Sequence, residues 1–145
     1  MNTHHVVRAT EGTAYDWAND RVRVLGAATW SDRALTLVED TLKPGFLLPR
    51  HHHRLMTETF YCLSGRVLFV FDDEQVALTA GDAVTVPPRV HHQVSSADGA
   101  RLLTVFSPGG FDLYLSEVAD LVAREVDDPQ LLLDLGHRHD IWPDE

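Results

Sequence analysis

The stretch GFLLPRHHHRLMTETFYCLSG, residues 45–65, sets three ligand-type side chains at short intervals between two glycines. His51 and His53 are separated by one residue, and four residues separate His53 from Glu58. Side chains two positions apart on a strand point to the same side of a sheet, so His51 and His53 can both face inward while His52 faces away. Glu58 begins an aromatic and apolar run that predicts a strand, and a turn before it can bring the carboxylate over the histidines.

A second stretch supplies a fourth side chain of the same kind. Five residues separate Gly81 from Pro87, and His92 lies five positions beyond Pro87. Three imidazoles and one carboxylate form a ligand set that divalent first-row metals accept. A barrel or sandwich is needed to bring the distant histidine to the others. The sequence therefore predicts one divalent metal ion bound by His51, His53, Glu58 and His92.

The rest of the chain up to residue 106 has a β pattern. Alternating or continuous apolar runs predict strands at residues 21–25, 34–38, 58–63, 66–71, 75–78, 83–86, 90–94 and 101–106. Ser64 and Gly65 are turn formers, so residues 58–71 are expected to form a hairpin.

The pattern changes after residue 110. From residue 111 to 126 the apolar side chains recur at helical spacing. Asp128 followed by Pro129 is typical of an N-cap and the first helical position, so a second helix is expected at residues 130–135, closed by Gly136.

The two stretches resemble the two sequence motifs of the cupin superfamily. The first motif matches at Gly45, His51, His53, Glu58 and Gly65, and the second at Gly81, Pro87 and His92. Arg89 stands where the pattern usually has glycine, and Ser96 where it usually has asparagine. Neither position is a metal ligand in that family, so the two departures concern the local turn and the shape of the pocket.

The resemblance implies an all-β fold, an antiparallel cupin (jelly-roll) barrel with C-terminal helices. Residues 1–145 are expected to form a single cupin domain, with the barrel at about residues 20–106 and the helical tail at about 111–136. The resemblance also implies the four metal ligands already named. Because antiparallel barrels leave strand edges that a second subunit can cover, a homodimer is expected.

Composition excludes several classes of partner. The formal net charge of −10 argues against nucleic acid and anionic membranes. Cys62 is the only cysteine, which excludes an internal disulfide and suits a reducing compartment. The sequence has no apolar run typical of a signal peptide or a membrane span, so we expect a cytoplasmic protein.

Strand alternation predicts a mostly apolar pocket around the metal. On the Glu58 strand the lining residues are Phe60 and Cys62 or, if the strand bulges, Tyr61 and Leu63. Core-facing runs add Phe69, Phe71, Val84, Val86 and Phe106. Such a pocket suits a hydrophobic, oxygen-bearing small molecule. The catalytic residues stay unassigned; the candidates are His52 and His91, both expected on the outer face, and Arg89.

The resemblance to small cupins leaves three functions open. One is a polyketide cyclase of antibiotic biosynthesis, which acts on an aromatic polyketide intermediate and uses a metal, with zinc favoured, as Lewis acid or structural anchor. The second is a quercetinase-like dioxygenase with iron, manganese, nickel or copper, and the third a non-enzymatic ligand-binding cupin. The complete ligand set argues against the third. One lysine against eleven arginines is typical of GC-rich bacteria such as actinomycetes, which together with the apolar pocket favours the cyclase.

Overall fold

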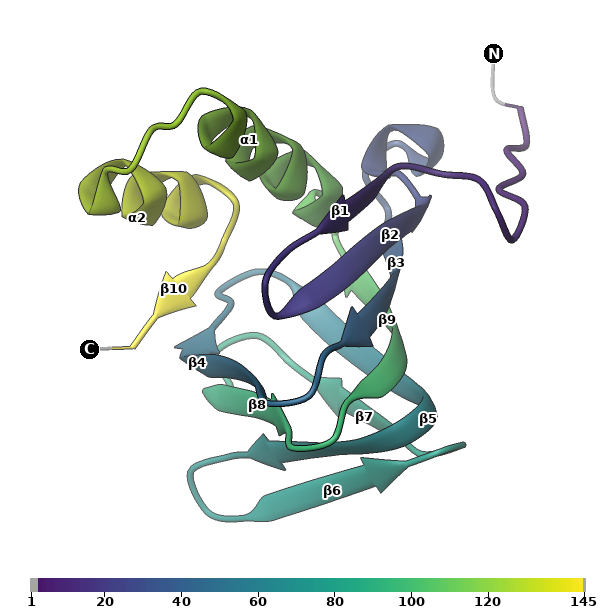
Figure 1. Ribbon diagram of the computed structural model, residues 1–145, viewed down its shortest axis with the longest axis vertical. Coiled ribbons are helices and arrows are strands. Elements are labelled where there is room, and N and C mark those ends of the chain that lie inside the picture. Colours follow the sequence, from purple (N-terminus) through teal and green to yellow (C-terminus); the bar gives the residue numbers. More distant parts are fainter. Residues whose placement is uncertain (1–2, 145) are drawn as a thin grey trace.

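The computed structural model describes residues 3–144. In these residues ten strands form one sheet that curls into a barrel, and two α-helices lie at one end of it (Figure 1). The strands are β1 (Ala14–Asp16), β2 (Asp20–Gly26), β3 (Thr36–Leu42), β4 (Phe46–His52), β5 (Thr57–Val70), β6 (Gln75–Thr79), β7 (Ala83–Val86), β8 (His92–Ser96), β9 (Ala100–Ser107) and β10 (Trp142–Pro143). The helices are the short 3-10 helix η1 (Ala28–Ser31), α1 (Phe111–Ala123) and α2 (Pro129–Arg138).

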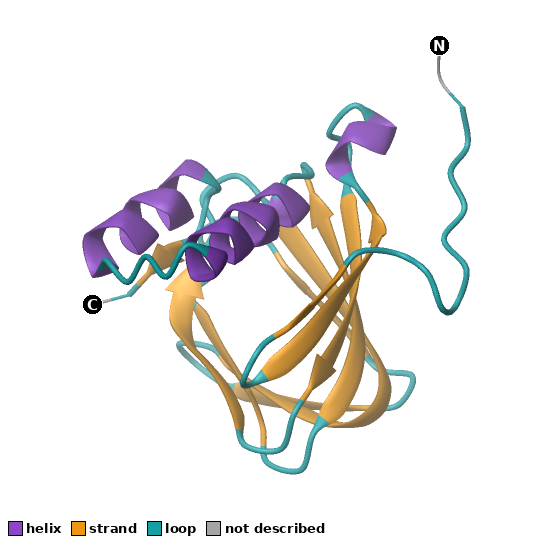
Figure 2. Ribbon diagram, turned by 45° about the horizontal axis from the view of Figure 1, so that its top comes forward, coloured by secondary structure: helices purple, strands orange, loops and turns teal. Residues whose placement is uncertain are grey.

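The strands pair antiparallel throughout and curl into the expected barrel. The order along the sheet is β1-β2-β3-β9-β5-β8-β4-β10, and β6 and β7 also pair with β5. Figure 2 shows the strands wrapped around one interior, with both helices on the same end. The outer edge of β1 pairs with no other strand within residues 3–144. The homodimer that the sequence predicts stays a prediction.

Strand β5 connects the two halves of the barrel. Its first part pairs with β7 and β9, and its second part pairs with β6 and β8. The hairpin expected at residues 58–71 is therefore wrong, because the chain continues through Ser64 and Gly65 as one strand of 14 residues. The pairing with β9 shifts between Cys62 and Ser64, and Gly65 has a φ of 79°. These two features bend the strand from one layer into the other instead of reversing it.

The apolar interior has two parts. The first cluster, at the end of the barrel away from the helices, includes Cys62, Val67, Phe69 and Leu102, each at most 1% exposed. The second cluster includes Val22, Val38 and Phe106 together with Leu115 of α1. The ring of Phe111 stacks on that of Phe106, with centroids 4.3 Å apart, which fastens the start of α1 to the barrel. A cavity described below is lined by members of both clusters.

The helical tail follows the sequence pattern at its start and departs from it at its end. The Asp128 carboxylate accepts hydrogen bonds from the N–H groups of Gln130 and Leu131, and Pro129 is the first residue of α2. Gly136 was expected to close this helix, but it is buried inside it, and a Cβ there would lie 3.2 Å from the carbonyl oxygen of Ile141. The helix thus continues past Gly136 because glycine lets the returning chain pack closely. In residues 3–144 no helix has the length and apolar character needed to cross a membrane.

The bend at Gly65 yields a stability prediction with a matched control. A Cβ on Gly65 would lie 2.4 Å from the carbonyl oxygen of Gly99, whereas one on Gly81 would meet nothing within 4 Å. Both glycines have a positive φ, so Gly81→Ala carries only backbone strain, about 1 kcal/mol. We expect Gly65→Ala to lower the free energy of unfolding by roughly 2–4 kcal/mol, because overpacking adds to that strain. Denaturant unfolding measures both, and equal losses would contradict the steric explanation.

Candidate metal centre

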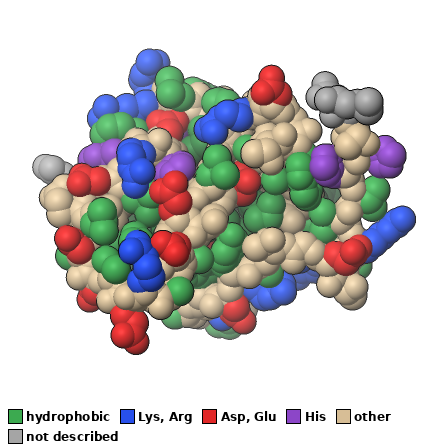
Figure 3. Space-filling model, turned by 90° about the horizontal axis from the view of Figure 1, so that it is seen from above, with side chains coloured by type: hydrophobic (Ala, Val, Ile, Leu, Met, Phe, Trp, Pro, Cys, Tyr) green, Lys and Arg blue, Asp and Glu red, His purple; other side chains and the backbone are tan. Residues whose placement is uncertain are grey.

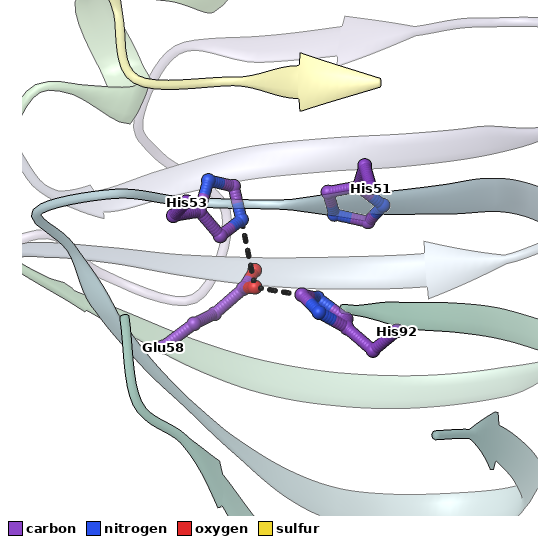
Figure 4. Close-up of side chains that lie close together, drawn as sticks. All are labelled: His51, His53, Glu58 and His92. Atoms are coloured by element: carbon purple, nitrogen blue, oxygen red, sulfur yellow. Dashed lines mark ion pairs between the residues drawn. The ribbon is translucent and has the colours of Figure 1, made fainter. Parts of the chain in front are cut away.

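The barrel brings the four predicted ligands together in its interior. His51, near the end of β4, pairs directly with His92, the first residue of β8. His53 follows the end of β4, and Glu58 is the second residue of β5. One donor atom from each of the four lies within 4.8 Å of the others, and no residue of the set is more than 6% exposed. Figure 4 shows the three rings around the Glu58 carboxylate.

Backbone carbonyls orient each of the three imidazoles. The Nδ1 atoms of His51, His53 and His92 lie 2.9, 2.7 and 2.9 Å from the carbonyl oxygens of Pro49, Asp140 and Val90. A carbonyl oxygen only accepts, so each Nδ1 carries the hydrogen and each Nε2 of the neutral ring keeps a free lone pair. Hydrogen bonds of this kind fix the ring orientation of metal-binding histidines.

The inner atoms of the cluster lack any other partner. Nε2 of His53, Nε2 of His92 and Oε1 of Glu58 are fully buried without a hydrogen bond. Oε1 lies 3.2 Å from Nε2 of His53 and 3.4 Å from Nε2 of His92. Lone pairs that face one another at this distance repel, unless a cation lies between them. For bonds of about 2.1 Å, the edge of a tetrahedral site is about 3.4 Å long, so these residues fit a divalent metal ion.

The pKa shifts keep two of the four groups in the protonation state that a metal requires. Burial, assisted by the neighbouring His92, lowers the pKa of His51 to about 4, so this ring is neutral at pH 7. Burial raises the pKa of Glu58, but the contacts with His53 and His92 outweigh it and hold the pKa at about 2. The carboxylate is thus ionised and can act as an anionic ligand. For His53, burial lowers the pKa, but the Glu58 carboxylate outweighs it and raises the pKa, so a bound metal would take the place of a proton on this ring.

The C-terminal segment supports the site from outside the barrel strands. The Asp140 carboxylate accepts hydrogen bonds of 2.7–2.8 Å from the N–H groups of Arg54, Leu55 and Met56. These donors outweigh the effect of burial and lower the pKa of Asp140. Since its own carbonyl oxygen holds His53, Asp140 fixes both the ring and the loop that leads to Glu58. The sequence pattern gave no indication of this role, because the contact spans more than eighty residues.

The three candidate catalytic residues lie outside the cavity beside the metal ligands. Nδ1 of His52 and Nδ1 of His91 lie 3.2 and 2.7 Å from the Asp144 carboxylate, which also accepts a hydrogen bond from Arg50. Neither histidine is among the described residues that line the cavity, and Arg89 is exposed and absent from the lining. Arg89 has a φ of 69°, which explains why the superfamily pattern has glycine at this position.

A cavity of about 700 Å³ opens beside the metal-ligand set. Its walls are mostly apolar, as the sequence predicts, and Phe60 and Phe106 both line it. Phe69 does not line it but packs edge-on against Phe60 in the first core cluster, with ring centroids 4.8 Å apart. The pattern missed the contribution of the tail, which supplies Phe111, Tyr114, Leu115, Val118, Ile141 and Pro143.

On the outer surface, seen from the helix end, acidic, basic and apolar side chains are interspersed (Figure 3).

Two carboxyl groups in the lining were also missed by the sequence reasoning. Asp20 begins β2, and Asp40 lies on the face of β3 that is otherwise buried. Alternation from Thr36 through Val38 to Leu42 would have placed Asp40 inside the barrel, had this strand been extended beyond residue 38.

Residues 38–106 match the Cupin_2 family model, whose description is a cupin domain. With the antiparallel barrel, this match shows a cupin domain in the chain, as its two motifs predict. The chain is 26% identical over 117 residues to the quercetin 2,3-dioxygenase of Bacillus subtilis, which covers 80% of this chain and 35% of that protein. It therefore spans about a third of the length of that relative.

Solved structures share the fold at lower identity. KdgF from Halomonas sp. has a TM-score of 0.67 and 18% identity, over 75% of this chain and 99% of that one. The polyketide cyclase RemF from Streptomyces resistomycificus has a TM-score of 0.63 and 20% identity, over 72% and 80%. These likenesses confirm the cupin barrel and carry no statement about activity.

The ligand assignment predicts the metal content of variants at neighbouring positions. We expect the purified protein to hold one divalent ion per chain and His53→Ala to lose most of it, because one inward lone pair disappears. His52→Ala is the matched control and should keep the metal, since His52 bonds Asp144 on the outer side. Elemental analysis of protein purified without chelators measures both, and equal metal content in the two variants would refute the assignment.

The support from Asp140 predicts a weaker metal site without any change of ligand. Asp140 has a φ of 65°, which glycine and asparagine both tolerate. Asp140→Gly keeps the carbonyl oxygen that holds His53 but removes the carboxylate that fixes the loop leading to Glu58, so metal affinity should fall by about 10-fold, the lower end of the usual cost of disturbing the groups that orient metal ligands. Asp140→Asn keeps an acceptor and should lose less. Competition with a chromophoric chelator measures the affinities, and wild-type affinity in Asp140→Gly would contradict this role.

Proposed function

We propose that this cupin is a metal-dependent enzyme that binds a hydrophobic aromatic or polyketide molecule and closes a ring in it, as a polyketide cyclase does. The observation that carries the proposal is the position of the ligand set in the wall of a largely apolar cavity. Such a cavity favours an apolar ligand, and the metal centre offers its few oxygen atoms a place to bind.

The residues of the cavity would act mainly by binding and orienting. The aromatic side chains of Phe60, Phe106, Phe111 and Tyr114 all line the cavity, so a flat ligand can pack against them. Holding a flexible polyketone in one conformation brings one pair of carbon atoms together and turns many closures into one. The helices and the C-terminal segment lie over the barrel end and would limit the access of water to a bound ligand.

A divalent metal bound by His51, His53, Glu58 and His92 would supply Lewis acidity toward a carbonyl oxygen. Zinc suffices for this chemistry because ring closure needs no change of oxidation state. The orientation of His53 by Asp140 and of His92 by Val90 keeps two of the donor atoms in place when a ligand enters.

A quercetinase-like dioxygenase is the second candidate. The 26% identity to a quercetin 2,3-dioxygenase over most of this chain supports it, and the same donor set accepts iron, manganese, nickel or copper. A flavonol fits the same requirement for an aromatic molecule that carries oxygen atoms. The two candidates differ in whether oxygen is consumed.

Oxygen dependence therefore tests the proposal. Zinc-loaded protein is incubated with an aromatic poly-β-ketone thioester, once under strict anaerobiosis and once in air, and iron-loaded protein is incubated with quercetin in air. We expect the thioester to cyclise at the same rate with and without oxygen, and the quercetin reaction to take up no oxygen. His53→Ala, without its metal, is the control. If quercetin is cleaved with uptake of oxygen and the thioester does not cyclise, the proposed cyclase function is refuted in favour of the dioxygenase.

A further inference from the structure

One carboxyl group inside the barrel belongs neither to the metal-ligand set nor to the apolar core. Strand β3 turns Thr36, Val38 and Leu42 into the interior, where all three are buried, and Asp40 occupies the same face between Val38 and Leu42. Its Oδ1 atom is fully buried and has no hydrogen-bond partner. Buried polar atoms without a partner are few in native proteins, so this one requires an explanation.

The neighbour of Asp40 is a second carboxyl group, that of Asp20. Strand β2, which Asp20 begins, pairs with β3, and both carboxyl groups line the same cavity. Two neighbouring carboxyl groups in an apolar surrounding repel one another unless one of them carries a proton. The two groups, named here the Asp20–Asp40 pair, are therefore expected to hold one proton between them. Burial and the charge of Asp20 raise the pKa of Asp40 to about 9, with a smaller contribution from Glu58 that a bound cation would offset.

The Asp20–Asp40 pair lines the same cavity as the metal ligands. Both carboxyl groups belong to the wall that includes His53 and Glu58, whose unpartnered, almost fully buried donor atoms already mark this cavity as a binding site. Asp40 as a residue is of intermediate exposure although its Oδ1 atom is covered, and it belongs to the lining of the cavity. The surrounding wall is apolar, with Val38, Leu102 and Phe106 nearby in the lining.

We propose that the Asp20–Asp40 pair is a second anchor for the ligand of this cavity, which hydrogen-bonds a hydroxyl or carbonyl oxygen of an aromatic molecule whose other oxygen atoms lie at the metal centre. Asp40 contacts the ligand, and Asp20 positions Asp40 by sharing the proton. The inference rests on the proposed function, because it assumes a ligand at the metal centre. It narrows the ligand class to aromatic molecules with oxygen atoms at two separate places, since a purely apolar ring would leave the pair without a partner.

Two flavones that differ only at one end of the molecule test this anchor. 3-Hydroxyflavone has one oxygen-bearing end that can bind a metal, and 3,7-dihydroxyflavone adds one hydroxyl at the opposite end. Their dissociation constants are measured by fluorescence titration on the zinc-loaded wild type, on Asp40→Leu and on Val38→Ala. Val38 is the matched control, because it lies on the same face of β3 and lines the same cavity without a polar group.

We expect the wild type to bind the dihydroxy compound at least about tenfold more tightly than 3-hydroxyflavone, and Asp40→Leu to remove that preference while 3-hydroxyflavone binds as before. Val38→Ala should weaken both compounds alike. Asp20→Asn, which can still hydrogen-bond Asp40, should keep most of the preference, and Asp20→Leu should lose it. Melting temperatures show that each variant is folded; Asp40→Leu should melt higher than the wild type, because a binding carboxyl in an apolar wall costs stability.

Equal weakening of both flavones by Asp40→Leu, or no change in either, would overturn the anchor and leave Asp40 a structural residue. If neither flavone binds the zinc-loaded wild type, the proposed ligand class is refuted. The zinc content of the same samples then separates this failure from a failure of the metal centre itself.

Discussion

Burying three imidazoles and a carboxylate in an apolar barrel is the constraint on which the rest of this structure depends. Ionisable groups removed from water are costly unless partners compensate each of them. Here the backbone carbonyls of Pro49, Asp140 and Val90 accept hydrogen bonds from the Nδ1 atoms of the three rings. The inner atoms face one another, and a divalent cation is the partner that satisfies all of them together. The β4–β8 pairing and the C-terminal segment can thus be understood as the means of holding this cluster.

Much of the site could be predicted because it depends on local spacing. The period of two along a strand turns His51 and His53 inward and His52 outward, whatever the rest of the fold does. Most of the strands also followed from local patterns, since short strand-like runs separated by glycine and proline turns recur along the chain. The antiparallel barrel that they form was implied by the resemblance to the superfamily motifs. Comparison with the superfamily motif placed His92, which no local argument could have brought to the other three.

The predictions that failed concern features that depend on contacts between residues far apart in the sequence. Ser64 and Gly65 are equally suited to a hairpin turn and to a bulge, and only the neighbouring β9, where Gly99 and Ala100 approach Gly65 closely, selects the bulge. Asp140 could not be recognised as a support for His53, because nothing in its local sequence indicates that the tail returns to β4. The two-residue strand β10 is too short to leave a pattern.

The missed carboxyl groups change the chemical character of the cavity. A wall composed only of aromatic and aliphatic side chains selects ligands by shape and apolar area, which discriminates weakly between similar rings. A polar group set in such a wall discriminates more strongly, because a ligand that cannot pair with it leaves a buried group unsatisfied. Local rules disfavour a carboxyl group in the row from Thr36 to Leu42, and residues that break local rules concentrate where a protein binds or reacts. The proposed anchor at Asp40 and the metal centre would then fix a ligand at two points, and two fixed points on a rigid ring determine which of its atoms lie next to the metal.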